Sequence, residues 1–240
     1  MARVALVTGG TRGIGEGISK ALKNAGCTVA ASYAGNDEAA NRFQSETGIK
    51  VFKFDVSNFD ACKEGVQKIT SELGPIEILV NNAGITRDTT LQRMSPEQWH
   101  AVINTNLNSL FNMCKLVIDS MREKKFGRII NISSVNGQAG QLGQTNYSAA
   151  KAGVIGFTKA LAKEGARNGI TVNVICPGYV GTEMVQAVPQ DVLQKIIATI
   201  PMGRLGTVED IARGVVFLAA DDAGWITGST LSINGGQHMF

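Results

Sequence analysis

The chain has 240 residues, of which 44% are apolar, and a formal net charge of +3. This length and apolar content suit one large α/β domain with a sizeable core, and they exclude an intrinsically disordered chain. Lysines and arginines are scattered without a basic stripe, so the composition predicts no nucleic-acid partner.

The spacing of the cysteines and the hydropathy of the chain indicate its cellular compartment. The four cysteines are Cys27, Cys62, Cys114 and Cys176. They lie far apart, without a Cys-x-x-Cys pair or adjacent histidines, which predicts no metal site and reduced thiols in a cytoplasmic protein. The amino terminus lacks the long apolar stretch of a signal peptide, and no apolar run approaches the roughly 20 residues of a membrane span. We therefore expect no membrane partner.

Short β-branched or aliphatic runs alternate with segments of helical length along the whole chain. The runs cover residues 4–7, 28–32, 51–54, 78–80, 128–132, 171–175 and 230–233. Continuous apolar strands separated by helices indicate a parallel sheet covered on both faces. With no linker to divide it, the chain is predicted to be a single domain over residues 1–240. Its expected fold is a doubly wound α/β Rossmann fold with seven strands, and residues 177–205 form a substrate loop.

A glycine-rich turn follows the first run. It contains Gly9, Thr11, Arg12, Gly13, Ile14 and Gly15. Small residues let the backbone approach a pyrophosphate at the positive end of a helix, so the turn predicts a dinucleotide site. A tight turn without a ligand is the structural alternative.

The end of the second run bears on which nucleotide binds. Residues 31–36, which include Gly35, lack the carboxylate that would hold a ribose 2′-hydroxyl. Arg12 is placed to meet a 2′-phosphate, which favours NADPH/NADP over NADH/NAD. Asp37 and Glu38 come a little late in the sequence to be the ribose ligand, yet they keep NADH/NAD open as the alternative.

Two further strand ends supply candidate cofactor residues. Asp55 and Val56 follow the third run and could contact the adenine ring, although Asp55 could equally cap a helix. Asn81 and Asn82 precede Ala83 and Gly84 after the fourth run. We expect residues 82–84 to lie along the cofactor through their backbone.

The spacing of three polar residues predicts a proton-transfer site. Tyr147 and Lys151 are four residues apart and would share one helix face, while Ser134 lies thirteen positions before Tyr147. An ammonium beside a phenol favours the phenolate, so we expect Lys151 to lower the Tyr147 pKa from about 10. Hydride transfer to a carbonyl needs an acid and a second hydrogen-bond donor, which Tyr147 and Ser134 could supply.

Together these motifs resemble the short-chain dehydrogenase/reductase family over essentially the whole chain. The resemblance is carried by residues 8–15, 81–84, 104–106, Ser134, Tyr147 with Lys151, and Pro177-Gly178 followed by Thr182. It implies that Tyr147 protonates the substrate oxygen, Ser134 hydrogen-bonds it, and Lys151 holds the nicotinamide ribose. It also implies that Asn106 anchors a water that relays protons. By the same resemblance Pro177, Gly178, Val180 and Thr182 join the cofactor site.

Within the family, the chain looks closest to the acetoacetyl-CoA reductases. Residues 82–88, 133–147, 177–179 and 234–239 carry this likeness. It implies NADPH-dependent reduction of acetoacetyl-CoA to (R)-3-hydroxybutyryl-CoA, a homotetramer, and a supply of product to polyhydroxybutyrate synthesis. The implied substrate residues are Asp88, Ser134, Gln141, Gln144, Tyr147 and Tyr179. A basic residue expected near the CoA phosphates is missing and Pro189 stands there, which leaves Lys195 or Arg204 as substitutes.

Two other functions remain open from the sequence. A 3-oxoacyl-carrier-protein reductase would share most of these motifs but would need a basic surface for its acidic carrier. A non-catalytic nucleotide-binding protein could use the same fold, because fold does not determine function.

Overall fold

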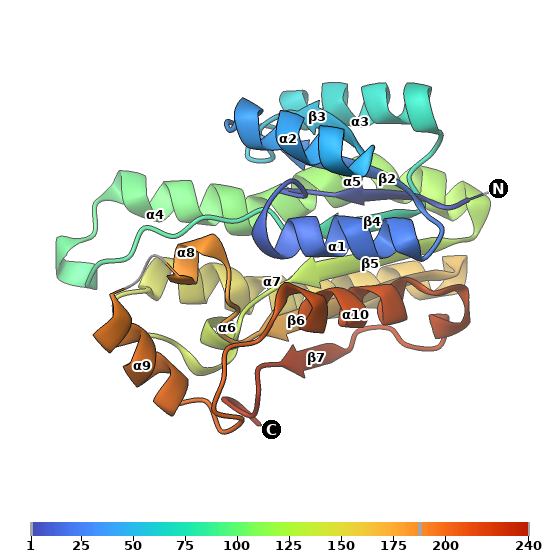
Figure 1. The fold of residues 1–240 in the computed structure, drawn as a ribbon. Helices are drawn as coiled ribbons and strands as arrows, with labels where there is room; N and C mark the ends of the chain where they lie inside the picture. Colours follow the sequence, from blue (N-terminus) through green and yellow to red (C-terminus); the bar gives the residue numbers. More distant parts are fainter. Residues whose placement is uncertain (1, 187–188, 240) are drawn as a thin grey trace.

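The computed structural model describes residues 2–186 and 189–239 and is built around one parallel sheet (Figure 1). The strands are β1 Val4–Val7, β2 Thr28–Tyr33, β3 Lys50–Lys53, β4 Ile78–Asn81, β5 Gly127–Ile132, β6 Ile170–Pro177 and β7 Thr230–Ile233. They are ordered β3-β2-β1-β4-β5-β6-β7, and every neighbouring pair is parallel. The predicted fold class is confirmed.

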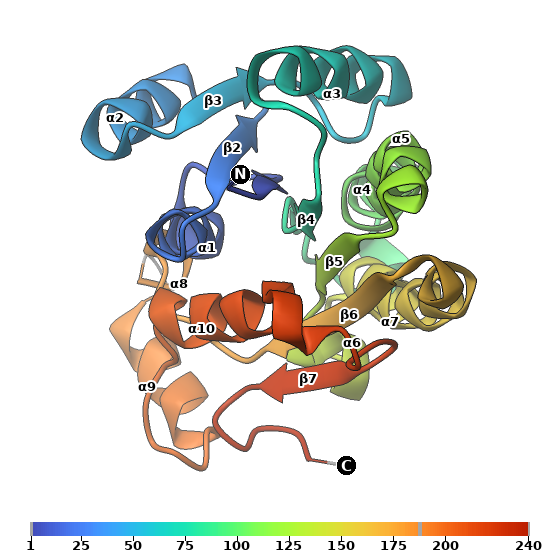
Figure 2. The same cartoon turned by 90° about the vertical axis from the view of Figure 1, so that its right-hand side faces the viewer.

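Helices cover both faces of this sheet (Figure 2). The α-helices are α1 Gly13–Asn24, α2 Asp37–Thr47, α3 Phe59–Leu73, α4 Pro96–Ile103, α5 Ser109–Lys124, α6 Val135–Ala139, α7 Thr145–Gly165, α8 Glu183–Gln186, α9 Gln190–Ala198 and α10 Val208–Ala219. Short helical turns are η1 Leu91–Arg93, the π-helix η2 Asn104–Asn108, η3 Ala166–Asn168 and η4 Asp221–Ala223. Helices α1, α2 and α10 pack on one face, and α3, α5 and α7 on the other.

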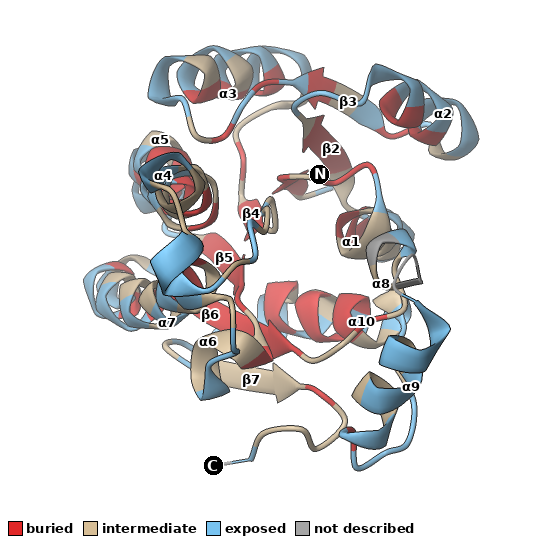
Figure 3. Ribbon diagram, turned by 90° about the vertical axis from the view of Figure 1, so that its left-hand side faces the viewer, coloured by how far each residue is buried: buried red, intermediate tan, exposed pale blue. Residues whose placement is uncertain are grey.

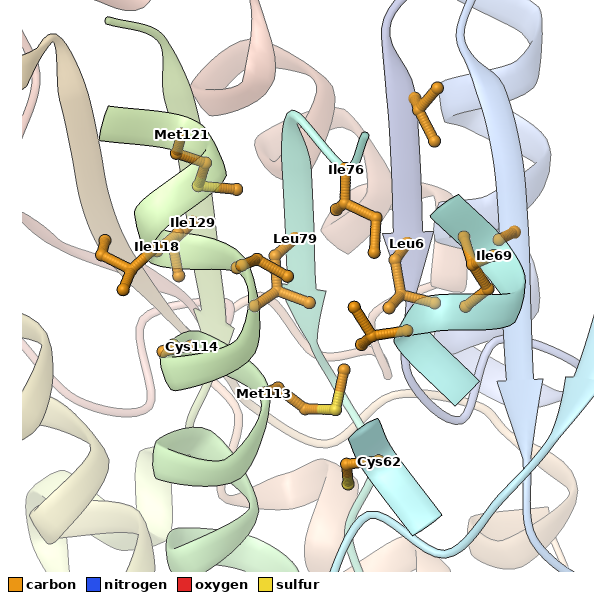
Figure 4. Close-up of a cluster of buried hydrophobic side chains, with 14 of the residues drawn as sticks. Leu6, Cys62, Ile69, Ile76, Leu79, Met113, Cys114, Ile118, Met121 and Ile129 are labelled. Atoms are coloured by element: carbon orange, nitrogen blue, oxygen red, sulfur yellow. The ribbon is translucent and has the colours of Figure 1, made fainter. Parts of the chain in front are cut away.

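The alternation of side chains along each strand explains why two cores form. In β1, Leu6 packs into the cluster with α3 and α5, whereas Ala5 and Val7 pack against α1 and α10. The first cluster is drawn in Figure 4, and Figure 3 shows the buried strands between the helical layers. A strand buried on both faces must be apolar at consecutive positions, which is why the strands are recognisable as continuous runs.

Glycines end three of the helical segments before a strand. Gly26, Gly74 and Gly169 have φ values of 90°, 100° and 70°, in the region that favours glycine. At Gly169 an added Cβ would lie 2.3 Å from the Lys125 carbonyl oxygen. Such sharp stops bring the next strand back into the sheet.

The segment between β6 and α10 lies beyond the carboxyl ends of the strands and contains α8 and α9 (Figure 1). Val180 forms an isolated bridge with Gly206, and the Met202 amide donates to the Gly235 carbonyl at 3.1 Å. Both ends of the predicted substrate loop are therefore anchored, while its residues 187–188 lie outside the described residues.

Candidate active site

A cavity of about 420 Å³ lies at the carboxyl ends of the strands, around β1 and β4, where the strand order reverses. In open α/β sheets this reversal point is where ligands bind. Of the predicted cofactor residues, all but Val180 line the cavity. Val180 does not, because its side chain is buried in the core against α10.

The glycine turn between β1 and α1 forms a close-fitting cradle. Gly9 and Gly13 have φ values of 61° and 53°, and a Cβ on Gly15 would lie 2.1 Å from the Gly9 carbonyl oxygen. No side chain caps the start of α1, whose N-cap residue is Arg12. Its first amide groups therefore point toward the cavity without a side-chain partner, as an anionic pyrophosphate requires. The residues fit a dinucleotide.

Asn82 holds this turn in place. Its side-chain amide donates to the carbonyl oxygens of Thr8 and Gly9 at 2.9 and 3.2 Å. The Thr8 hydroxyl in turn accepts from the backbone amides of Asn82 and Ala83 at 3.0 and 3.1 Å. Asn82 thus serves the neighbouring turn, whereas Asn81, the last residue of β4, donates to the Asn131 side chain at 2.9 Å. Ala83 and Gly84 remain at the cavity surface.

The carboxylates near the end of β2 are held away from the cavity. The side chain of Asn36 caps α2 by accepting from the Ala39 amide at 2.9 Å. Asp37 pairs with Lys53 at 2.8 Å, and hydrogen bonds from Lys53 and Tyr33 lower the pKa of its carboxyl group. The exposed Arg12 lines the cavity together with residues 33–36, and neither Asp37 nor Glu38 does.

Asp55 does not cap a helix. Its carboxylate accepts from the backbone amide and the hydroxyl of Ser57 at 2.9 and 2.8 Å, and Asn58 is the N-cap of α3. Both Asp55 and the buried Val56 line the cavity. Of the two readings that the sequence left open for Asp55, the structure is compatible with the ligand-facing one.

Ser134, Tyr147 and Lys151 meet at one wall of the cavity. Ser134 begins α6, and its hydroxyl oxygen accepts from the Asn136 backbone amide at 3.1 Å. Tyr147 lies in the first turn of α7 and hydrogen-bonds Ser134. The Lys151 ammonium is buried and donates to the Ile132 carbonyl oxygen at 2.8 Å.

The predicted lowering of the Tyr147 pKa is wrong for this structure. Burial raises the Tyr147 pKa to about 12, against a smaller lowering by the hydrogen bond from Ser134. Burial also lowers the Lys151 pKa to about 8. The Lys151 Nζ lies 5.6 Å from the centre of the Tyr147 ring and is committed to Ile132, so desolvation outweighs the attraction between the two groups.

Asn106 is fully buried in the π-helix η2 and does not line the cavity. Its side-chain oxygen accepts from the Ile85 amide at 2.8 Å, and its side-chain nitrogen donates to the Ile85 carbonyl at 2.7 Å. Both ends of the Asn106 side-chain amide are thus hydrogen-bonded to the Ile85 backbone. A water relay through Asn106, as the resemblance implies, would therefore use its backbone carbonyl and not its side chain.

The four predicted substrate residues outside the catalytic group do not line the cavity. Asp88 and Gln144 contact each other through a 2.7 Å hydrogen bond. Asp88 and Tyr179 lie close enough to Tyr147 for their charges to act on its pKa. Gln141 is exposed, and its carbonyl accepts from the Gln144 amide at 3.1 Å.

The two basic residues that could replace the missing CoA-phosphate contact differ in their surroundings. Lys195 is exposed on α9. Arg204 is engaged by Asp210 at 3.1 Å and by the Leu205 carbonyl. Pro189 precedes α9.

Sequence reasoning missed several residues that line the cavity. They are Ser32, Tyr33, Ala34, Asn36, Phe54, Ile85, Thr86, Thr105, Ile132, Ser133 and Glu183. Most of them lie within a few positions of the carboxyl end of a strand, and that position was the signal that could have found them. Asn136, which contacts both Ser134 and Gln144, was also missed.

Comparison with known proteins agrees with this geometry. Residues 9–238 match the model of the enoyl-(acyl carrier protein) reductase family, a short-chain dehydrogenase/reductase model. The chain belongs to the short-chain dehydrogenase/reductase family. It is an oxidoreductase that depends on a nicotinamide dinucleotide.

Individual relatives in this family cover the chain almost completely. An acetoacetyl-CoA reductase of Shinella zoogloeoides is 66% identical, with 99% of each chain covered. An acetoacetyl-CoA reductase of Rhizobium meliloti is 64% identical over the full length of both chains. A 3-oxoacyl-[acyl-carrier-protein] reductase of Haemophilus influenzae is 47% identical, with 99% of this chain and 98% of the relative covered.

The described residues hold neither a metal-binding cluster nor a membrane-spanning helix. Residues 2–186 and 189–239 contain no group of three or more histidine, cysteine, aspartate or glutamate side chains placed to hold a metal ion. Within the same residues, none of the helices combines the length and the apolar character that crossing a bilayer requires.

Proposed function

We propose that the chain is an NADPH-dependent acetoacetyl-CoA reductase that forms (R)-3-hydroxybutyryl-CoA and so supplies polyhydroxybutyrate synthesis. The observation that carries this proposal is the meeting of Ser134, Tyr147 and Lys151 at one wall of the cavity that the glycine turn also lines. The names of the relatives at 64–66% identity support the choice of substrate.

In this proposal, the protein supplies the proton and the positioning. The reduced nicotinamide, when bound, supplies a hydride to the carbonyl carbon. Tyr147 donates its phenolic proton to the carbonyl oxygen, so that the C=O π bond is replaced by one C–H and one O–H bond. The Ser134 hydroxyl hydrogen-bonds Tyr147 in this structure, and with substrate bound it would donate to the carbonyl oxygen and stabilise the developing negative charge.

Tyr147 is in the protonated state that the reductive direction needs. A phenol with a pKa of about 12 stays protonated at neutral pH and can donate, although burial makes it a weaker acid than an exposed tyrosine. Lys151, with a pKa of about 8, can carry a proton toward Tyr147 from a water held at the Asn106 carbonyl. Its ammonium would also hold the nicotinamide ribose.

The proposed preference for NADPH rests on charge at the end of β2. Arg12 is exposed at the cavity, and the nearby Asp37 carboxylate is occupied by Lys53. A 2′-phosphate would therefore meet a cation without facing an unpaired carboxylate.

The substrate side of the proposal assigns the thioester to Asp88, Gln141, Gln144 and Tyr179. These residues present amide, carboxylate and phenol groups around the mouth of the site, near Tyr147. For the CoA phosphates, Lys195 is preferred over Arg204 because Arg204 is engaged by Asp210.

The rival substrate is an acyl-carrier-protein thioester, which the name of the 47% identical relative favours. Steady-state kcat/KM should be measured for acetoacetyl-CoA and for acetoacetyl-carrier protein, each with NADPH and NADH. We expect acetoacetyl-CoA with NADPH to give the highest value. A carrier-protein substrate preferred by orders of magnitude would overturn the substrate assignment, and turnover with neither thioester would mean that the enzyme reduces a different carbonyl substrate.

We also propose a cytoplasmic homotetramer. The edge strand β7 pairs only with β6 within the described sheet, and Phe217 and Trp225 beside it are 57% and 99% exposed. Covering them with a second copy would bury this apolar surface. Light scattering on the purified protein should give the mass of four 25.4 kDa chains. A monomer mass at micromolar concentration would contradict it.

The proposed cytoplasmic location rests on the four free cysteines.

A further inference from the structure

A chain of three polar side chains crosses the mouth of the site. The Asn136 side-chain nitrogen donates to the Gln144 oxygen at 2.9 Å. The Gln144 side-chain nitrogen then donates to an Asp88 carboxylate oxygen at 2.7 Å. Three separate segments are joined in this way: the loop after β4, helix α6 and the start of α7.

The two ends of this chain are themselves anchored. Asp88 lies on an exposed loop, yet the Arg87 carbonyl accepts from the buried Asn146 side chain at 3.2 Å, and the Thr89 amide donates to the Gly143 carbonyl at 2.8 Å. Asn136 lies in α6, two residues after Ser134, and its backbone amide donates to the Ser134 hydroxyl oxygen. Gln144 is therefore held between two fixed points.

Donor and acceptor chemistry makes the chain directional. A carboxylate only accepts, so Asp88 requires the nitrogen end of the Gln144 amide. The oxygen end then faces Asn136, which donates to it. One hydrogen of the Gln144 amide nitrogen is used by Asp88, and the second remains available.

We propose that Asn136 is a positioning residue for substrate binding: it fixes the Gln144 amide so that Gln144 offers an N–H group to a carbonyl oxygen of the acyl thioester. This inference rests on the proposed function, because it takes Gln144 as a substrate contact. Without Asn136, only Asp88 holds the Gln144 amide, so the remaining freedom of its oxygen end must be lost when the substrate binds, and that cost weakens binding.

The geometry predicts that substrate binding and the chemical step respond differently. Asn136 contacts Ser134 through its backbone amide, and that contact survives any change of the side chain. Asn136→Ala should raise KM for acetoacetyl-CoA about three- to tenfold, as expected for one hydrogen bond, with kcat within about twofold. NADPH affinity and melting temperature should stay at wild-type values.

Asn136→Asp provides a second variant of nearly the same shape. Its carboxylate cannot donate, so the Gln144 amide would lie between two carboxylates that only accept. The Gln144 oxygen would then face a negative charge in place of a donor. KM should rise more than in Asn136→Ala. Equal or smaller effects of the aspartate would contradict the proposed direction of the chain.

Gln138→Ala is the matched control. Gln138 lies on the same short helix, but its amide donates to the Ser232 hydroxyl at 3.0 Å and does not approach Gln144. Gln138→Ala deletes a side-chain amide from α6 and leaves the hydrogen bonds between Asn136, Gln144 and Asp88 intact, so KM should not change.

The decisive experiment is a double-mutant cycle in KM with Asn136→Ala, Gln144→Ala and the combined variant. If Asn136 acts through Gln144, its replacement should change KM less than about 1.5-fold once Gln144 is alanine. Effects that multiply would overturn the proposal. The cycle can be read with any 3-oxoacyl thioester that the wild-type enzyme reduces, so it fails separately from the choice of acetoacetyl-CoA.

Discussion

The cofactor half of the site and the substrate half are built in different ways. Around β1 and β4, the cavity wall is made of backbone held in tight turns, such as Gly15 packed against the Gly9 carbonyl and Asn82 bonded to Thr8. Around α6 and the start of α7, the proposed substrate residues lie outside the cavity lining and are held by side chains bonded to other side chains, as in Asn136, Gln144 and Asp88.

This difference affects how each half tolerates change. A closely packed backbone turn has little freedom to relax when an atom is added. Side-chain contacts at a partly exposed mouth can be exchanged one at a time, with a cost near that of a single hydrogen bond. We expect cofactor binding to be lost in large steps and substrate preference to shift in small ones.

The largest effect is expected where the two halves meet, at Tyr147. Tyr147→Phe removes the acid with little change in volume, and kcat should fall by about 10² to 10⁴-fold. NADPH binding, followed by fluorescence titration, should remain within about twofold. Unchanged turnover would refute the role given to Tyr147.

Gly15→Ala tests the rigidity of the cofactor half. The added Cβ would lie 2.1 Å from the Gly9 carbonyl oxygen, so the turn must shift and the dissociation constant for NADPH should rise on the order of ten- to a hundredfold. Gly156→Ala is the control, because its Cβ would meet nothing within 4 Å on helix α7. Equal NADPH affinities in the two variants would argue against a rigid cradle.

Arg12→Ala separates the two nicotinamide nucleotides. Losing a charge-assisted contact with the 2′-phosphate should weaken NADPH binding about tenfold and leave NADH binding unchanged. Arg42→Ala removes an exposed arginine of α2 that does not line the cavity and should change neither affinity. If Arg12→Ala weakened both nucleotides equally, Arg12 would be a general pyrophosphate contact.

The smallest predicted effect is a dependence on pH. Lys151 is charged below its pKa of about 8 and becomes neutral as pH rises through that value. Because kcat/KM for NADPH reports the free enzyme, it should fall roughly threefold between pH 7.5 and 8.5. A profile that stays flat to pH 9.5 would show that Lys151 remains protonated or is not needed.

The difference between backbone-built and side-chain-built parts of the site explains which features could be predicted from the sequence. The seven strands and the glycine turn were predictable, because continuous apolar runs and glycine spacing reflect backbone requirements directly. The meeting of Ser134, Tyr147 and Lys151 followed from the order of strands and from one helical turn.

Other features depend on three-dimensional surroundings that spacing does not encode. The direction of the Tyr147 pKa shift was mispredicted because it is set by burial and by the bond between Lys151 and the Ile132 carbonyl. The hydrogen bond between Asn136 and Gln144 crosses a turn between two helices, so no periodic pattern indicates it. The pairing of Asp37 with Lys53 likewise joins a helix to a strand sixteen residues away.

Product analysis tests the central claim most directly. Purified enzyme is incubated with NADPH and either acetoacetyl-CoA or crotonyl-CoA, whose double bond is the target of an enoyl reductase. We expect one NADPH to be oxidised for each (R)-3-hydroxybutyryl-CoA formed from acetoacetyl-CoA, and no oxidation with crotonyl-CoA. Saturation of crotonyl-CoA without reduction of acetoacetyl-CoA would contradict it.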